Sequence, residues 1–554
     1  MSHTVANGTL FACVDVRGQL CDVYAMSPEG ELQNYTPGAA VRHRIGVWID
    51  GVYSWLDDAD WQVRQTASQT SLSVHTTATN TVLGVQLAIT TAVDCRDAII
   101  LREFHLTNLM QNARTVRLFL HQAFVLGDGK LTDDTVQLIP HHQAVVQYNG
   151  STTFAVGARV DGGLFSEYAV GMFGTGHYEG TWRDAEDGRL DGGLAETGKV
   201  DSTLQLDCTL QPQGVAMMEY WLVQADSIAG ALQLHSRMVA TTVAKRLAAT
   251  TVAWRRWLRP ATARLAVCAP KQQTELLQSL LPIAARITTQ GTVMTELSGL
   301  QRTAYCRPYH AAKALMPLVE LGYTKEPLAF FTTCSRSLQT NGYLPAAITS
   351  DGSPGPGALL RTCEAPYAVD YVLGMAATIQ LTYCYCLKHI RTAPLATLYK
   401  DLIAPLATAL SRTAELDMCN PPATGYCVHS LDTIEARLLV RIALESATAL
   451  AERLHDDAAA VAWRMAAEDI PQQPLCHDIA YDEADTHATI WKARQYISDG
   501  RLAEARALLD QLTNYLHTHG YIADRLIDGQ PISVATQGEY AATLLALAQA
   551  RRKR

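Results

Sequence analysis

The sequence predicts an α+β chain in which an antiparallel β-sandwich over residues 1–225 precedes a helical barrel of the α/α type over residues 272–554. The first part alternates apolar and polar positions with a period of two, whereas the second repeats apolar positions three and four apart. A helical linker region at 226–271 joins them. At 554 residues with 48% hydrophobic content, the chain is long enough to bury a core in each part.

The β half consists of short alternating segments such as TSLSVHTTATN, VLGVQLAITTAV, IILREFHLTN, TVRLFLHQAFV and AVVQYNG. These segments are rich in Val, Thr, Leu and Phe, and Gly, Asn and Asp interrupt them about every 8–12 residues. Such spacing is typical of a large antiparallel sandwich, in which each strand turns one face to the core.

The helical half begins after SIAGALQLHSRMVATTVAKRLAATTVAWRRWL, which has no interior proline and carries its apolar residues on one face. Further helices are predicted at LLQSLLPIAARI, AAKALMPLVELG, TIEARLLVRIALESATALAERLH, AAAVAWRMAAEDI and RLAEARALLDQLTNYLHTHG. Gly- and Pro-bearing loops separate them without a fixed repeat length, which favours a double-layered barrel over a solenoid.

Composition excludes several function classes. A net charge of −9, with RRKR at the end as the single basic run, gives no footprint for nucleic acid. The N-terminal segment lacks a secretory signal pattern, and no apolar run approaches the length of a membrane span. Thirteen cysteines without CxxC spacing indicate reduced thiols. We therefore expect a cytoplasmic protein with no metal, cofactor, nucleic-acid or membrane partner.

Several segments carry a resemblance to a known family. The β half contains NGTL, RHRIGVWIDGVYSW, EGTWRDAEDGRLDGG and KVDSTLQL, of which GTWRDAEDG is the most specific. The helical half contains WRRWL, ELGY, NGYLPAAITSDGSPG and LESATALAERLHDDAAAVAWRMAAEDI. In this order they resemble bacterial and archaeal glucoamylases and the related trehalases, a family of glycoside hydrolases. The resemblance implies a β super-sandwich and an (α/α)6 barrel whose active site lies in the funnel at one end.

That family's chemistry makes defined demands. Inverting hydrolysis of an α-glucoside needs a carboxylic acid that protonates the leaving oxygen and a carboxylate that activates water, about 6.5–9.5 Å apart. Polar groups must also grip the hydroxyls of the terminal glucose, and the family uses an Arg-Asp pair for this. An α-glucan or a small glucoside is therefore the expected ligand.

The sugar-gripping position differs from the family. Its Trp-Pro-Arg-Asp motif falls, by ungapped counting, on Arg307, Pro308, Tyr309 and His310. Tyr309 and His310 could stack on a sugar or hydrogen-bond to it, but they lack the charged, bidentate grip of Arg and Asp. The alternative is that both residues simply fill the entrance of a helix.

The general-acid position also differs. The family's Trp-Glu-Glu motif falls on Tyr426, Cys427 and Val428, and no Asp or Glu occurs at residues 421–430. Cysteine is a poor proton donor to a glycosidic oxygen. Tyr426 and Cys427 are therefore expected to line the binding site without supplying an acid.

Other carboxylates remain as candidates. The late loop HGYIADRLIDGQPISVATQGEYAA is the equivalent of the loop that carries the family's general base, and its candidates are Asp524 and Asp528. In LLRTCEAPYAVDYVLGM, Glu364 falls on the glutamate of a pocket-lining motif of the family. Glu364 is the polar residue most expected to line the funnel.

Three functions fit these residues. In the first, which we favour, the chain has lost hydrolysis and binds a glycan or a protein partner. In the second, it is an active α-glucoside hydrolase of the glucoamylase, trehalase or dextran-glucosidase type, with Glu364 and Asp524 as catalytic carboxylates. In the third, the pocket carries out glycosyl transfer or phosphorolysis, with contributions from His310, Cys427 and His429.

Overall fold

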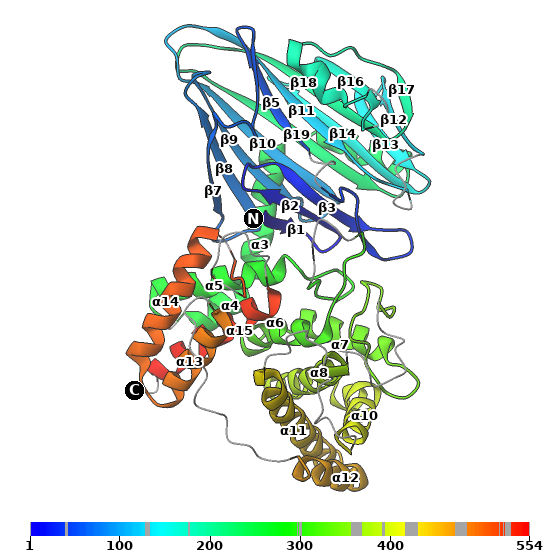
Figure 1. The fold of residues 1–554 in the computed structure, drawn as a ribbon, viewed down its shortest axis with the longest axis vertical. Coiled ribbons are helices and arrows are strands. Elements are labelled where there is room, and N and C mark those ends of the chain that lie inside the picture. The colour runs from blue at the N-terminus through cyan, green and yellow to red at the C-terminus, as the bar shows by residue number, and fades with distance from the viewer. Residues whose placement is uncertain are drawn as a thin grey trace. The chain divides into compact units, whose positions relative to one another are not determined.

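The structure is a computed structural model, and it describes residues 2–38, 43–127, 133–174, 178–266, 268–295, 297, 302–355, 368–389, 394–415, 430–470, 485–519, 521–524, 526 and 533–552. By its internal contacts the chain divides into two compact units. Unit 1 comprises Met1–Leu258 with Ser298–Ala304, and unit 2 comprises Arg259–Leu297 with Tyr305–Arg554. Figure 1 shows strands in the blue-to-cyan part of the chain and helices from green to red.

The strands of unit 1 pair antiparallel in three sheets. Their bounds are β1 (Ser2–Ala6), β2 (Leu10–Asp15), β3 (Leu20–Met26), β4 (Leu32–Asn34), β5 (Ile45–Ile49), β6 (Val52–Trp55), β7 (Gln62–Ala67), β8 (Ser73–Asn80), β9 (Val85–Val93), β10 (Ile99–Asn108), β11 (Arg114–Ala123), β12 (Asp134–Ile139), β13 (Ala144–Asn149), β14 (Thr152–Val160), β15 (Gly163–Leu164), β16 (Glu167–Met172), β17 (Ala195–Gly198), β18 (Val200–Leu210) and β19 (Val215–Ala225).

One sheet has the order β1-β2-β3-β4, and the largest has the order β17-β12-β13-β14-β19-β10-β9-β8-β7 with β15 beside β14. The third has the order β16-β18-β11-β5-β6. Alternate residues of these sheets share one hydrophobic core, which includes Phe104, Leu118 and Leu204. Phe124 and Phe154 stack within it, with ring centroids 4.3 Å apart. The predicted period-two segments are therefore strands, each burying one face.

The helices of the described chain have the following bounds: α1 (Thr181–Asp184), the 3-10 turn η2 (Ala185–Asp187), α2 (Ile228–Val239), α3 (Val243–Trp257), α4 (Arg259–Leu265), α5 (Pro270–Ala284), α6 (Pro308–Glu320), α7 (Lys325–Ser337), α8 (Ala368–Lys388), α9 (Leu395–Leu398), the π-helical turn η3 (Tyr399–Ile403), α10 (Ala404–Glu415), α11 (Ser430–Arg453), α12 (Asp457–Glu468), α13 (Thr486–Ser498), α14 (Leu502–His519) and α15 (Val534–Arg552).

The segment GTWRDAEDG forms α1 and η2 of unit 1 and packs on the β16-β18-β11-β5-β6 sheet. The backbone N–H of Thr181 donates to Asp201 Oδ2 at 2.9 Å. Gly180 has φ 131°, and a Cβ there would lie 2.6 Å from the same oxygen. Gly188 has φ 88°, and its Cβ would lie 2.6 Å from the indole nitrogen of Trp48. The glycines of this segment are therefore required by close packing and by left-handed backbone.

Within unit 2, α6 packs along α15 and α8, α8 packs against α11, and α13 packs against α15. The α6–α15 contact depends on Gly538, whose added Cβ would lie 2.4 Å from the carbonyl oxygen of Lys313. A buried bidentate ion pair joins Arg506 on α14 to Glu275 on α5, at 2.8 and 2.9 Å. These contacts bring the N-terminal ends of α6, α13 and α15 together.

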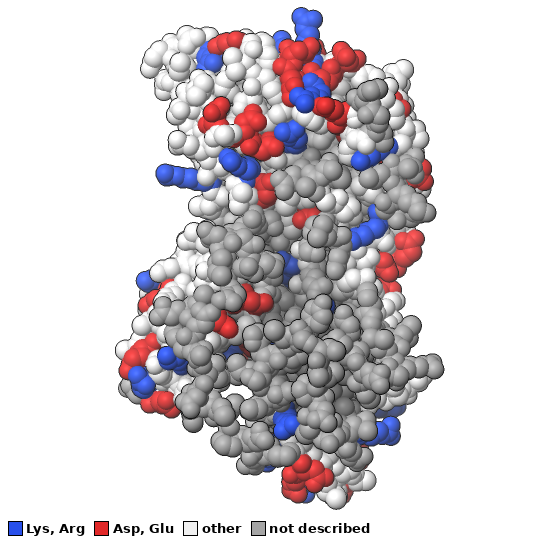
Figure 2. All heavy atoms as spheres, viewed as in Figure 1, with Lys and Arg blue, Asp and Glu red and all other residues white. Residues whose placement is uncertain are grey.

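Acidic and basic side chains of the described residues lie beside one another on the face drawn in Figure 2. Exposed ion pairs of the described chain include Arg183 with Glu179 and with Glu186. Neither sign of charge dominates among the described residues on that face. No helix within the described ranges has both the length and the apolar composition needed to cross a membrane.

The predicted order, an antiparallel β-sandwich followed by a helical region, is confirmed. The boundary between the two compact units falls between Leu258 and Arg259, inside the region 226–271 that we expected to be a linker. The helices α2 and α3 belong to unit 1, because their apolar faces join a core with strands of the largest sheet.

Candidate functional site

The predicted sugar-gripping residues lie in the first turn of α6. Pro308 occupies the first helical position, where its missing N–H leaves no partner unsatisfied. The rings of Tyr309 and His310 are half-buried, and their centroids are 5.4 Å apart. One turn later, Lys313 Nζ lies 4.4 Å from the centre of the Tyr309 ring, in cation–π range. The aromatic side chain therefore contacts a cation of its own helix.

Lys313 in turn forms an ion pair with Glu539 of α15, with Nζ 2.6 Å from Oε1. The two side chains are 19% and 11% exposed. Gly538 makes this contact available, because the absence of a Cβ lets the two helix backbones approach closely. The carboxylate of Glu539 thus lies beside the first turns of α6.

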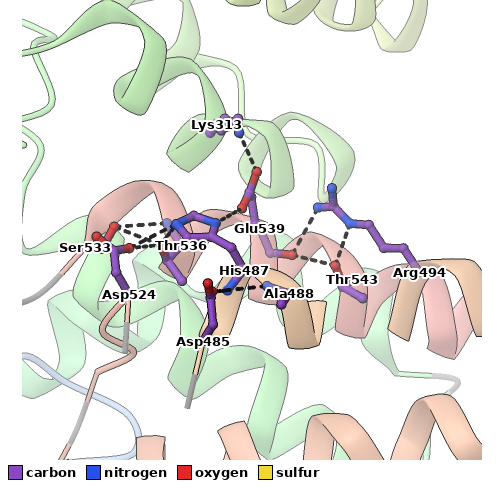
Figure 3. Close-up of polar contacts among 10 residues, drawn as sticks. All are labelled: Lys313, Asp485, His487, Ala488, Arg494, Asp524, Ser533, Thr536, Glu539 and Thr543. Atoms are coloured by element: carbon purple, nitrogen blue, oxygen red, sulfur yellow. Dashed lines mark hydrogen bonds and ion pairs between the residues drawn. The ribbon is translucent and has the colours of Figure 1, made fainter. Parts of the chain in front are cut away.

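His487 bridges two carboxylates (Figure 3). Its Nδ1 lies 3.0 Å from Glu539 Oε2, and its Nε2 lies 3.2 Å from Asp524 Oδ1. Asp485 places the ring by capping α13, since its Oδ1 accepts from the backbone N–H of His487 at 2.9 Å and of Ala488 at 3.2 Å. Because both ring nitrogens face carboxylates, the arrangement favours the doubly protonated imidazolium.

Asp524 belongs to the segment 521–524, which leads toward α15. Thr536 donates its hydroxyl to Asp524 Oδ1 and lies 3.1 Å from the Nε2 of His487 and 2.9 Å from the hydroxyl of Ser533. The backbone carbonyl of Asp524 accepts from the N–H of Thr486 at 3.0 Å. The carboxylate is therefore held from α13 and α15, while 59% of its side chain stays exposed.

The segment that carries Asp524 is also anchored through its backbone. The N–H of Ile522 donates to the Oε1 of Gln537 at 2.7 Å, and the Nε2 of the same buried amide donates to the carbonyl of Ser279 at 2.9 Å. Gln537 thus connects this segment to α5.

The pKa values of His487, Asp524 and Glu539 are all shifted toward the charged form. Burial by itself would lower the pKa of His487, but its two carboxylate partners outweigh that effect and raise it to about 10. Burial would raise the pKa of Asp524, yet hydrogen bonds from His487, Thr536 and Ser533 hold it well below its usual range. The pKa of Glu539 is also lowered. Burial would raise it, but the hydrogen bond from His487 and the charges of Lys313 and Arg494 outweigh that effect. At neutral pH the cluster therefore holds two carboxylates and several cations.

Arg494 of α13 completes the surroundings of Glu539. Its guanidinium donates to the Oγ1 of Thr543 at 2.8 Å and to the backbone carbonyl of Glu539 at 3.2 Å. These bonds tie α13 to α15 about two turns after His487, so the imidazolium has a rigid support.

The arrangement is best suited to accepting hydrogen bonds. Asp524 offers a half-exposed anionic acceptor, which can bind hydroxyl groups. A carboxylate whose pKa is lowered accepts a proton less readily than an ordinary one. Among the described residues, no group of three or more His, Cys, Asp or Glu is placed to hold a metal ion.

The structure brings Tyr309 and Asp524 into one chain of contacts, through Lys313, Glu539 and His487. Lys313, Glu539 and His487 are not among the site residues predicted from the sequence. His487 lies in the sequence Thr-His-Ala-Thr directly after Asp485, and Glu539 follows Gln537 and Gly538. Neither segment has a sequence pattern that distinguishes it from an ordinary helix start or helix face.

The remaining predicted site residues, Glu364, Tyr426, Cys427, His429 and Asp528, lie outside the described ranges. In the sequence, 364 and 426–429 come shortly before the first residues of α8 and α11.

Comparison with known proteins addresses the fold. No protein-family model and no curated protein matches this chain. Among solved structures, a bacterial glucoamylase complexed with acarbose has a TM-score of 0.70 at 10% sequence identity, covering 100% of this chain and 95% of that chain. A putative kojibiose phosphorylase from the human microbiome has a TM-score of 0.50 at 9% identity, covering 85% of this chain and 67% of that chain. The chain therefore has the glucoamylase-like fold, as its sequence motifs predicted.

Proposed function

We propose that the helical unit binds an α-glucan or a small glucoside at the N-terminal ends of α6, α13 and α15, and does not hydrolyse it. The observation that carries this proposal is the set of hydrogen bonds that Asp524 already accepts. This residue lies in the loop that is expected to supply the general base. His487 and Thr536 already hydrogen-bond to this carboxylate, and they lower its pKa. It can accept hydrogen bonds from sugar hydroxyls, but it is a weak base toward water.

The general-acid position supports the same proposal. The stretch 421–430 contains no Asp or Glu, and Tyr426 and Cys427 stand where the family has its acid motif. Hydrolysis with inversion needs both carboxylic groups, since one protonates the leaving oxygen while the other activates water. Binding needs neither, only shape and hydrogen-bonding groups.

The proposed ligand follows from fold and chemistry together. The chain matches a bacterial glucoamylase complexed with acarbose over its whole length, which makes a glucoside the first ligand to test. Tyr309 presents an aromatic ring of the kind that sugars stack on, and Asp524 presents an acceptor. Glu364, Tyr426 and Cys427 are proposed to complete the site. A protein partner remains a prediction from the sequence alone, as does the cytoplasmic location.

Calorimetric titration with maltose, isomaltose, trehalose and dextrin, combined with a glucose-release assay, tests this proposal. We expect binding of at least one of these sugars without release of glucose. Asp524→Asn should weaken binding about tenfold, because it removes a charged acceptor. Asp499→Asn, at an exposed aspartate that ends α13, is the matched control and should bind as the wild type does.

The outcomes separate the three functions. Glucose release that Asp524→Asn abolishes would establish the hydrolase and overturn the non-hydrolytic proposal. Release of a glucose phosphate in the presence of inorganic phosphate would establish phosphorolysis, the reaction that the name of the second structural neighbour suggests. If none of the sugars binds to the wild type, the chain is not a receptor for glucosides of this class.

A further inference from the structure

A cavity lies at the opposite ends of α6 and α15 from the Asp524 cluster. The C-terminal ends of α6, α8 and α15, together with the end of α4, surround a cavity of about 350 Å³. This volume lies at the lower end of the range for small-molecule sites, roughly 300–1,000 Å³. Its lining includes Arg264, Leu265, Glu320, Lys388, Leu545 and Gln549.

The cavity is separate from the Asp524 cluster. Lys313 and Glu320 are seven residues apart on α6, which corresponds to about 10 Å along the helix axis. Glu539 and Leu545 are six residues apart on α15, which corresponds to about 9 Å. A monosaccharide bound at one site would therefore not contact the other.

The charges of this cavity do not cancel. Lys388 Nζ forms an ion pair with Glu320 Oε2 at 3.2 Å, so these two groups neutralise each other. Arg264 adds a further positive charge, and no carboxylate of the described residues forms an ion pair with it. The charged side chains of the lining thus sum to one positive charge, which favours an anion against the partial negative charge of the helix C-terminal ends around the cavity.

Arg264 is also positioned by its packing. Gly322, the second residue after α6, has φ 88°, and a Cβ there would lie 2.9 Å from the Nε and 3.0 Å from the Nη2 of Arg264. The guanidinium therefore rests against the backbone at the end of α6. A guanidinium offers paired N–H donors that match a carboxylate or a phosphate.

The rest of the lining suits a ligand with hydroxyl groups and an apolar side. The amide of Gln549 and the Glu320–Lys388 pair can donate and accept hydrogen bonds. Leu265 and Leu545 supply an apolar floor.

We propose that this cavity is a second binding site, for an anionic monosaccharide that bears a carboxylate or a phosphate. Arg264 binds the anionic group, and the Glu320–Lys388 pair and Gln549 bind the hydroxyls.

Calorimetric titration of the full chain with glucuronate, glucose 6-phosphate, inorganic phosphate and neutral glucose tests the proposal. Binding of glucuronate or glucose 6-phosphate, more tightly than glucose, is expected. The first arm reports a carboxylate ligand and the second a phosphate ligand. Arg264→Met, which keeps the apolar part of the side chain, should weaken this binding at least about tenfold. Arg259→Met, at an exposed arginine that begins the same helix, should leave it unchanged.

A second variant tests the cavity by shape. Gln549 is exposed, so Gln549→Trp should fill the recess without disturbing the core, and it should also abolish binding. Thermal unfolding of each variant verifies that it is folded. The proposal is overturned if neither sugar anion binds the wild type below about 10 mM, if inorganic phosphate binds as tightly as glucose 6-phosphate, or if folded Arg264→Met binds as the wild type does. Glucoside binding is measured on the same variants and should persist, so failure of one site does not imply failure of the other.

Discussion

Replacing His487 by glutamine removes the cation that lies between Asp524 and Glu539. The rise of its pKa from about 6.5 to about 10 corresponds to roughly 5 kcal/mol of interaction with the folded protein. However, 48% of the side chain is exposed, so solvent screening reduces the net contribution to about 1–2 kcal/mol. For a helical unit of this size, that loss corresponds to a fall in the unfolding midpoint of about 2–8 °C.

The dependence on pH has a defined sign. The pKa of His487 is higher in the folded than in the unfolded state, so its stabilisation is complete below about pH 6.5 and is lost as the pH rises through about 10. The pKa values of Asp524 and Glu539 are lower in the folded state, so their stabilisation is present above about pH 4 and is lost in stronger acid. The cluster therefore stabilises unit 2 most between about pH 4.5 and 6.5.

Thermal unfolding of wild type and His487→Gln, measured between about pH 6 and 10, tests these statements. The difference in midpoint should be largest near pH 6 and should shrink toward pH 10. NMR of the protein labelled at its histidine rings should show one resonance, absent in the variant, that titrates far above the usual range. A His487 resonance that titrates near pH 6.5, or a difference in midpoint that does not change with pH, would refute the reasoning.

His75 provides the matched control. Its Nδ1 lies 3.1 Å from the hydroxyl of Thr90, and partial desolvation of the ring lowers its pKa. It lacks the carboxylate bridge, so the effect of His75→Gln should stay constant between about pH 7 and 10.

Further predictions concern the packing that holds the site. Gly538→Ala should destabilise the chain by about 1–3 kcal/mol, because the new Cβ would lie 2.4 Å from the Lys313 carbonyl, whereas Gly374→Ala, with its nearest neighbour at 3.5 Å, should be neutral or stabilising by up to about 1 kcal/mol. Denaturant unfolding measures the change in stability caused by each substitution. Equal changes would contradict the close approach of α6 and α15 at Gly538. Glu275→Gln should cost about 1–3 kcal/mol, since it removes a carboxylate whose side chain is 1% exposed and leaves Arg506 with Asp510 as its ion-pair partner; a cost below about 0.5 kcal/mol would mean that the Arg506–Glu275 pair is dispensable.

The β-sandwich was predictable because its signal is local. In the second part of β10, Phe104 and Leu106 are fully buried, whereas Glu103 and His105, each directly before one of them, are partly exposed, so the alternation in sequence is the alternation in burial. The same holds for the helices, where the segment AAKALMPLVELG falls within and directly after α6. Period and turn residues act over a few positions, so the sequence displays them directly.

The partners of each element were not visible in the same way. The leucines of β11 and β18 could be predicted to face a core, but the order β16-β18-β11-β5-β6 follows from how the sheets assemble. Likewise, α2 and α3 read as a linker, yet their apolar faces pack on the largest sheet. An apolar helix face in the sequence predicts that the face is buried, but it does not predict which surface it packs against.

For the site, the sequence by itself determined two candidate positions, Tyr309 at the start of a helix and Asp524 in a late loop. Only the tertiary structure decided that His487 and Glu539 join them, because these residues are 52 positions apart and Lys313 is a further 226 positions from Glu539. The ionisation of Asp524 was equally hidden. A pKa depends on the donors within hydrogen-bonding distance, and those donors are brought together by the close approach of α6 and α15 at Gly538 and by the cap of α13.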